Sequence, residues 1–439
     1  MKKFLILFLF LSLFVVGAAF AEAPASSPPK VDTGDTSWIL ISSALVMLMT
    51  PGLAFFYGGM VRRKNVLSTI MMSFAILLLV AVLWVLYGYS LAFGPDKGGI
   101  IGGLDWFALN GVGQTPSSVY ATTVPHLAFM IFQAMFAIIT VALFTGAIVE
   151  RIKFSAVMVF AVLWLTLVYA PVAHWVWAAG GWLHNLGTED FAGGIVVHIN
   201  AGVSALALAL VLGPRKGFRE KEPMEPSNIA MVVLGAALLW FGWFGFNAGS
   251  ALTAGGLASS AFVATNTAGA TAGLTWMLLS WFHRRPSLLG AATGAIVGLA
   301  AVTPAAGFVQ PWAGIPIGAV AAILSYYMML FRSRKMGVDE SLDVWACHGI
   351  GGTWGVIAVG IFATTAVNAA GANGLIRGGT KLIGNQLIGA AVVWVFSFGM
   401  TWLLASIVKA VIGFRVNEVE ERLGLDISQH GEKTYGGLP

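Results

Sequence analysis

Long apolar segments recur along most of the chain, and this pattern constrains the fold more than any other feature. Each is long enough to cross about 30 Å of hydrocarbon as a helix. With 58% hydrophobic and 10% charged residues, a soluble domain could not bury the apolar surface. We therefore predict an all-α polytopic membrane protein with eleven transmembrane helices. These helices are expected near 37–60, 66–93, 124–149, 153–178, 191–212, 226–249, 256–281, 287–305, 312–331, 344–365 and 385–412.

The two ends of the chain differ from its apolar middle. Lys2 and Lys3 precede an apolar run that ends in the small-residue pattern Ala19-Phe20-Ala21, which is typical of a secretory signal peptide cleaved after Ala21. The last residues are too polar to span a membrane. The predicted divisions are a signal peptide at 1–21, an outer arm at 22–36, a transmembrane domain at 37–412 and a cytosolic tail at 413–439.

Basic residues are concentrated in alternate connections between the predicted spans. The positive-inside rule places these connections in the cytoplasm, so we expect a multi-pass protein of the cytoplasmic membrane with its N-terminus outside and its C-terminus in the cytoplasm. The net charge is +5, but the basic residues lie in several short loops rather than on one face. We therefore predict no nucleic-acid partner. The connections carry Arg62, Arg63 and Lys64; Arg151 and Lys153; Arg215, Lys216, Arg219 and Lys221; Arg284 and Arg285; and Arg332, Arg334 and Lys335.

Two histidines lie at membrane depth in corresponding spans. The spans form two groups of five plus one extra helix, and an odd group size means that a repeat of the first group would be inverted. His198 follows Asp190 by about 12 Å of helix and His348 follows Asp343 by about 7 Å, from opposite faces. The histidines can therefore meet near the midplane. We expect Asp190 and Asp343 to be helix N-caps that support them.

Packing histidines and a metal site are the alternatives for this pair. Zinc would need three or four ligands, and no carboxylate or thiolate cluster accompanies the histidines. Cys347, the single cysteine, is next to His348 and is expected to point elsewhere on a helix. The sequence therefore predicts neither a metal site, a cofactor nor a catalytic residue.

Five motifs in order identify a family. The chain resembles the ammonium transporter (Amt/Mep/Rh) family, bacterial Amt branch, from about Trp38 to the tail. The motifs are PGLAFFYGG at 51–59, FQAMF at 132–136, DFAGGIVVHIN at 190–200, WFGFNAGS at 243–250 and CHG at 347–349.

The resemblance implies a homotrimer in which each subunit has its own narrow, hydrophobic pore. It also implies roles for residues along that pore. The outer ammonium-binding site would be Phe132, Trp177 and Ser250, the gate Phe136 and Phe246, and the pore pair His198 and His348.

The physical chemistry of ammonium agrees with these roles. An aromatic face attracts the cation by roughly 0.5 to 2 kcal/mol, and a serine oxygen can accept one of its N–H bonds, which potassium lacks. An unpaired charge cannot cross a dry pore cheaply. Ammonium can leave a proton behind and pass as ammonia, and two hydrogen-bonded imidazoles could accept or relay that proton.

The tail resembles the family's C-terminal regulatory region. In relatives that region contacts the neighbouring subunit and PII-type signalling proteins, so a PII-type protein is the partner predicted there. An ammonium sensor and a membrane enzyme are the alternative functions. A sensor usually has an appended signalling domain, for which this tail is too short, and an enzyme would need further catalytic groups.

Overall fold

The computed structural model describes residues 30–434. Within this part, nine helices are long and apolar enough to cross a membrane. The predicted signal peptide at 1–21, and most of the outer arm, lie outside the described residues. The first helix, α2 (Thr33–Met60), begins before position 37 because the Asp32 carboxylate caps it by accepting the N–H of Asp35 at 2.9 Å.

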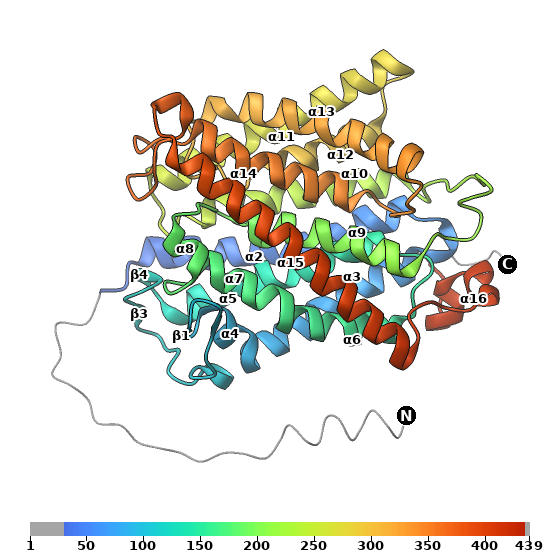
Figure 1. Cartoon of the computed structure of the whole chain (residues 1–439), viewed down its shortest axis with the longest axis horizontal. Coiled ribbons are helices and arrows are strands. Elements are labelled where there is room, and N and C mark those ends of the chain that lie inside the picture. The colour runs from blue at the N-terminus through green and yellow to red at the C-terminus, as the bar shows by residue number, and fades with distance from the viewer. Residues whose placement is uncertain (1–29, 435–439) are drawn as a thin grey trace.

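The long helices follow the order expected from the apolar segments (Figure 1). Two predicted spans, α11 and α12, are helical but are not among the nine: α11 is rich in Gly, Ala and Thr, and α12 has only 15 residues. The number of eleven crossings therefore stays a prediction. The helices after α2 are α3 (Val66–Leu83) with α4 (Tyr89–Phe93), α5 (His126–Leu143), α6 (Phe154–Trp164) with α7 (Ala170–Trp177), α9 (Asn200–Leu212), α10 (Ile229–Trp243), α11 (Gly256–His283), α12 (Leu288–Val302), α13 (Gly314–Phe331), α14 (Gly351–Phe362) and α15 (Lys381–Ile412).

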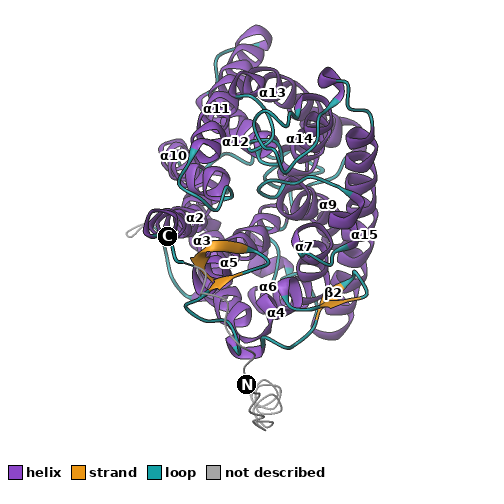
Figure 2. Ribbon diagram, turned by 90° about the vertical axis from the view of Figure 1, so that its left-hand side faces the viewer, coloured by secondary structure: helices purple, strands orange, loops and turns teal. Residues whose placement is uncertain are grey.

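Short elements cover the two ends of this bundle (Figures 1 and 2). One end carries α8 (Trp182–Leu186) and two small antiparallel pairs of strands. The other end carries α16 (Glu418–Leu423). The strands are β1 (Asp96–Lys97) with β2 (Ile101–Gly102), and β3 (Pro116–Ser117) with β4 (Ala121–Pro125).

The packing of the first five long helices recurs in the next five. Helix α2 packs on α5 as α10 packs on α12, and α3 packs on α5 as α11 packs on α12. The fifth members, α9 and α14, contact each other's first turns, where a Cβ atom on Gly202 would lie 2.1 Å from the backbone nitrogen of Gly349. Only glycine permits this approach. The contacts agree with the predicted five-helix repeat plus one extra helix, α15.

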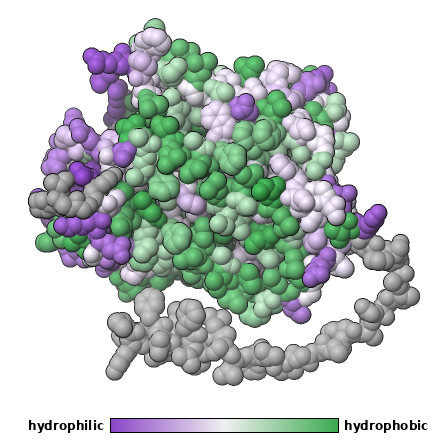
Figure 3. Space-filling view, turned by 180° about the vertical axis from the view of Figure 1, so that it is seen from behind, coloured by the Kyte–Doolittle hydropathy of each residue, from purple (hydrophilic) through white to green (hydrophobic). Residues whose placement is uncertain are grey.

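The molecular surface separates apolar from charged side chains. Apolar side chains cover the middle of the face in Figure 3, and hydrophilic ones gather toward both ends. At the α16 end the basic loops converge, and we call this end the basic face. There Arg215 pairs with Glu150 at 2.6 Å and with Asp339 at 2.8 Å, and Arg62 also reaches Glu150. Burial alone raises the pKa of Glu150, but Arg215 and Arg62 outweigh it and hold that pKa at about 2.

The C-terminal tail folds back onto the basic face. The Asp426 carboxylate accepts the backbone N–H groups of Leu67, at 3.0 Å, and Ser68, at 2.7 Å, and so caps the start of α3. Lys64 donates to the carbonyl oxygen of Glu421 at 3.0 Å, and Arg415 pairs with the Glu421 carboxylate at 2.6 Å. The Asp426 cap and the Lys64 hydrogen bond thus attach the tail to the start of α3, while the Arg415–Glu421 pair lies within the tail.

Removing the Asp426 carboxylate should loosen the tail. Asp426→Ala leaves two amides of α3 without their acceptor and should weaken the attachment by about 1 kcal/mol per lost cap. Limited proteolysis of the purified protein should then cleave the tail faster than in the parent. Asp426→Asn keeps one acceptor oxygen, so its tail should be cleaved at a rate between those of the parent and Asp426→Ala. Equal cleavage rates for the parent and Asp426→Ala would contradict the capping role.

Candidate functional site

A cavity near the strand-bearing end contains the residues predicted to bind ammonium. Its volume is about 210 Å³, and Phe132, Trp177 and Ser250 all line it together with Phe136. Helix α5 supplies the two phenylalanines, α7 ends at Trp177, and Ser250 follows the turn after α10. The structure therefore brings together three side chains that are far apart in the sequence.

Hydrogen bonds orient the two polar members of this cavity. The Ser250 hydroxyl donates to the carbonyl oxygen of Phe246 at 2.8 Å, so its oxygen lone pairs remain available as acceptors. The Trp177 indole N–H donates to the carbonyl oxygen of Asp190 at 2.9 Å. With its N–H engaged, the indole can offer its ring face to a cation.

Aromatic rings continue from this cavity toward the centre of the bundle. The ring of Phe136 lies 5.8 Å from that of Trp177 and 4.3 Å from that of Phe246. The ring of Phe246 in turn stacks on the imidazole of His198 at 6.0 Å. Both phenylalanine side chains are at most 1% exposed. The predicted gate residues are thus in contact and separate the cavity from the histidines.

The two predicted histidines meet in the middle of the bundle. Their Nδ1 atoms are 3.2 Å apart, and their ring centroids are 5.2 Å apart with 25° between the ring planes. The rings are 1% and 3% exposed, for His198 and His348 respectively. The interaction is a hydrogen bond, so one Nδ1 must carry a proton and the other must accept it.

Thr303 determines which imidazole donates. The Thr303 hydroxyl donates its proton to the carbonyl oxygen of Leu299 at 2.8 Å, so its oxygen can only accept from Trp243 Nε1, at 2.9 Å, and from His198 Nε2, at 3.3 Å. His198 therefore carries its proton on Nε2 and accepts at Nδ1. His348 must donate from Nδ1, which leaves its Nε2 as a bare lone pair.

Each pore histidine lies in a π-helical turn at the start of its helix. His198 is in the turn Gly194–Ile199 before α9, and His348 is in Trp345–Ile350 before α14. Phe246 lies in a third such turn, Phe244–Ala248. Turns of this kind are rare in proteins as a whole. Where they occur they are often at functional sites, because they displace side chains from α-helical register. No sequence pattern considered above indicates them.

A carboxylate eight residues before each of the two histidines holds the turn in which that histidine lies. The Asp190 carboxylate accepts the N–H groups of Gly193, Gly194, Ile195 and Val196, at 2.5 to 3.1 Å. Burial still raises the pKa of Asp190, although these amides lower it. In this way one residue orients both Trp177 and the helix of His198.

Glu340, rather than Asp343, occupies the matching position in the second half. The Glu340 carboxylate accepts the N–H groups of Val344, at 2.9 Å, and Trp345, at 3.2 Å. Burial raises the pKa of Glu340 to about 7, with Arg332 opposing this shift and Asp343 adding to it. Asp343 does not accept from these amides: it adopts a left-handed backbone conformation with φ +60° and pairs with Arg332 at 2.5 Å. The expectation that Asp343 is an N-cap is therefore corrected.

The sequence could have pointed to Glu340. Asp190 and His198 are eight residues apart, and so are Glu340 and His348, whereas Asp343 is only five before its histidine. Thr303 and Trp243 carried no comparable signal, because a lone threonine and a lone tryptophan in apolar spans usually serve packing.

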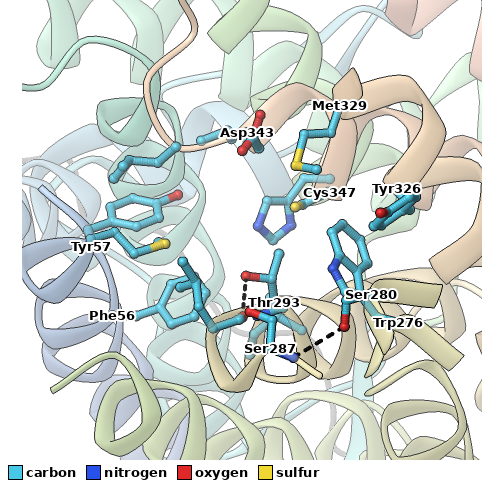
Figure 4. A pocket seen from close by; sticks show the side chains of 17 residues that line it. Phe56, Tyr57, Trp276, Ser280, Ser287, Thr293, Tyr326, Met329, Asp343 and Cys347 are labelled. Carbon is cyan, nitrogen blue, oxygen red and sulfur yellow. Dashed lines mark hydrogen bonds between the residues drawn. The ribbon is translucent and has the colours of Figure 1, made fainter. Parts of the chain in front are cut away.

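The cavities on the two sides of the histidines differ greatly in volume. The cavity that contacts both His198 and His348 together with Phe246 holds about 10 Å³, barely enough for one water molecule. A second cavity, toward the basic face, holds about 270 Å³ and is lined by His348, Tyr57 and Cys347 among others (Figure 4). We call it the inner cavity. Within residues 30–434 no group of three or more His, Cys, Asp or Glu side chains could hold a metal ion.

Comparison with known proteins agrees with this arrangement. Residues 37–435 match the model of the Ammonium Transporter Family. The chain belongs to this family. Among curated relatives, the ammonium transporter of Bacillus subtilis (strain 168) is 52% identical over 92% of this chain and 98% of its own length. Ammonium transporter Amt1 of Archaeoglobus fulgidus is also 52% identical, over 92% of this chain and 99% of its own.

Solved structures of ammonium transporter family relatives have the same fold. Mep2 of Saccharomyces cerevisiae superimposes with a TM-score of 0.85 at 37% identity, covering 93% of this chain and 94% of that chain. A protein described as "Sensor Amt Protein" superimposes with a TM-score of 0.83 at 29% identity, covering 90% of this chain and 98% of that chain. The resemblance predicted from five motifs is confirmed across the whole membrane domain.

Thr303 offers a direct test of how the histidine pair is arranged. Thr303→Val keeps the side-chain shape but removes the acceptor of Trp243 and His198. Losing a hydrogen bond worth about 1.4 kcal/mol should lower flux of methylammonium by about tenfold. Thr303→Ser retains the hydroxyl and should stay near the parent. Flux is measured per amount of protein in the membrane, and equal flux in both variants would rule out this role of Thr303.

Proposed function

We propose that this protein transports ammonium by binding it at the cavity of Phe132, Trp177 and Ser250, removing a proton and conducting ammonia past His198 and His348. One observation carries this proposal: a continuous row of aromatic rings leads from that cavity to a buried imidazole pair. The described residues that line the 10 Å³ cavity at the pair include no Asp, Glu, Lys or Arg. Membership in the Ammonium Transporter Family supports the same substrate.

Binding at the outer cavity favours ammonium over a bare metal cation. The ring faces of Phe132 and Trp177 attract any small cation. The lone pairs of Ser250, whose own proton is donated to Phe246, additionally accept an N–H bond, which ammonium has and potassium does not. Selection at this step is partial, because rings alone also attract potassium.

The narrow section beyond Phe136 and Phe246 selects more strongly. Both rings are buried and in contact, so an ion that enters loses its water and gains no counter-charge, which is strongly unfavourable. Ammonium avoids this cost by dissociating into ammonia and a proton. His198 and His348 each have one protonated and one unprotonated nitrogen, and that of His348, Nε2, is not engaged within the pair, so the pair can accept or relay the proton while ammonia continues.

An ammonium sensor is the second candidate, favoured by the structural likeness to the Sensor Amt Protein. A sensor and a transporter can share the same outer site, so net uptake separates them. In cells that lack other ammonium carriers, expression of this protein should restore growth on limiting ammonium and accumulation of methylammonium. Binding without accumulation would favour the sensor. A membrane enzyme finds no support in a family of transporters.

Further proposals concern the assembly and its surroundings. We propose a homotrimer in the cytoplasmic membrane, with the mature N-terminus outside and the basic face in the cytoplasm. The concentration of Arg62, Arg151, Arg215 and Arg332 at one end supports that orientation. A PII-type protein is the partner proposed for the tail and basic face.

Substitutions at the outer site should act at low substrate concentration. Trp177→Leu removes an aromatic face worth roughly 0.5 to 2 kcal/mol to the cation, and Ser250→Ala removes an acceptor. Methylammonium uptake should fall several-fold at limiting concentration and recover toward the parent at saturation. Transport unchanged at limiting substrate in both variants would contradict the assignment.

Acidic substitutions at the histidine pair should change which ion crosses. His198→Asp or His348→Glu introduces a fixed charge or a strong acceptor at membrane depth, where a potassium ion could now be compensated. Uptake of potassium should therefore rise relative to that of methylammonium.

The control for this experiment is the amount of protein in the membrane. If the histidines only pack, the variants should be less abundant but equally selective. The role in selectivity is wrong if well-expressed His198→Asp and His348→Glu proteins exclude potassium as fully as the parent does.

A further inference from the structure

The inner cavity gathers soft donor atoms from three separate elements. Cys347 and His348 come from the π-helical turn before α14, Met329 comes from α13, and Met60 ends α2; all four line this cavity of about 270 Å³. In Figure 4 the sulfur-bearing side chains of Cys347 and Met329 point into the same space. Ammonium transport as proposed above uses neither sulfur atom.

His348 adds a nitrogen lone pair to this set. Its Nδ1 is engaged by His198, and the acceptor role of Thr303 leaves no proton on Nε2. The His348 side chain is only 3% exposed, and its hydrogen bond to His198 uses Nδ1 rather than Nε2. A buried imidazole nitrogen with a lone pair directed to a cavity can act as a metal ligand.

The expectation that Cys347 points away from His348 is corrected by the cavity. Both side chains line it, whereas neighbours in an α-helix diverge. Their turn is π-helical, and its wider winding brings successive side chains closer to one face than an α-turn does. The fold therefore lets a thiol and an imidazole line the same cavity.

We propose that the inner cavity binds one soft monovalent cation, copper(I) or its analogue silver(I), through Cys347 Sγ and His348 Nε2, with Met329 Sδ as a further donor. Thiolate and thioether sulfur select ions of this class. Binding releases the thiol proton to water as the metal–sulfur bond forms. A bound ion occupies the exit from the histidine pair and takes the lone pair of His348, so it should block the pore.

Direct binding is measured with silver(I), which needs no reductant. The purified full-length protein is equilibrated with silver nitrate in chloride-free buffer, desalted, and analysed for metal and protein. We expect the parent to retain silver in an amount equal to the protein. Cys347→Ala removes the single cysteine of the chain and should retain none. A parent that retains no silver, or a Cys347→Ala variant that retains as much as the parent, overturns the proposal.

A matched pair of methionine variants tests the geometry. Met329→Leu removes a thioether at the cavity and should weaken silver binding by about tenfold or more, the loss found even for outer-shell partners of metal ligands. Met72→Leu changes a buried methionine that is not among the cavity residues and should bind like the parent. Equal affinity in the two variants excludes Met329 and with it the proposed donor set.

The block is measured in proteoliposomes as methylammonium flux, each variant being compared with its own flux without silver. The parent should lose flux as silver binds, and Cys347→Ala should keep it. The flux measurement rests on the proposed function, whereas the silver-binding measurement does not. Absence of flux without silver would refute transport alone, whereas silver bound in full with undiminished flux would refute the blocking role.

Discussion

The energetic cost of an unpaired charge away from water governs how this chain is built. In the described structure the buried charged side chains lie toward the two ends of the helices, where basic side chains or backbone amides surround them. Glu150 is fully enclosed, yet Arg62 and Arg215 hold it ionised. Along the pore, where no such counter-charges are available, the only titratable side chains at the narrowest cavity are His198 and His348. In the pore that we propose, an ion would therefore find no group to replace its water.

Helix N-termini provide the means of holding a neutral pair in such a place. Four amides converge on Asp190 and two on Glu340, each eight residues before a histidine. The amides and the helix dipole favour negative charge on these carboxylates and so oppose the effect of burial, which raises the pKa of both. The two caps lie at opposite ends of the bundle, so the helices they anchor bring their imidazoles to one point from opposite sides. The backbone carbonyl oxygen of Asp190 also accepts the indole N–H of Trp177. Asp190 therefore connects the outer cavity to the histidine pair.

Neutrality alone does not give the pair a direction. The hydroxyl of Thr303 does so, because its single proton is committed to Leu299 and its oxygen must accept from both Trp243 and His198. The protons of the pair then point one way, and the bare nitrogen of His348 faces the inner cavity. That nitrogen can accept from ammonia in transit, and the neighbouring thiol makes it a ligand for a soft cation as well.

The sequence by itself determined the membrane fold and the family, and it predicted the residues that the structure brings together around His198 and His348, because hydrophobic length, basic loops and motif order are local properties of the chain. It could also have identified Glu340, since the spacing to His348 repeats that from Asp190 to His198. The tertiary structure alone decided the pairing of Asp343 with Arg332, the π-helical turns, and the contact of Thr303 with His198. These depend on how helices meet, as at Gly202 and Gly349, where the two backbones approach so closely that a Cβ atom would not fit. Cys347 illustrates the difference: α-helical spacing turned it away from His348, and the packed fold set both against one cavity.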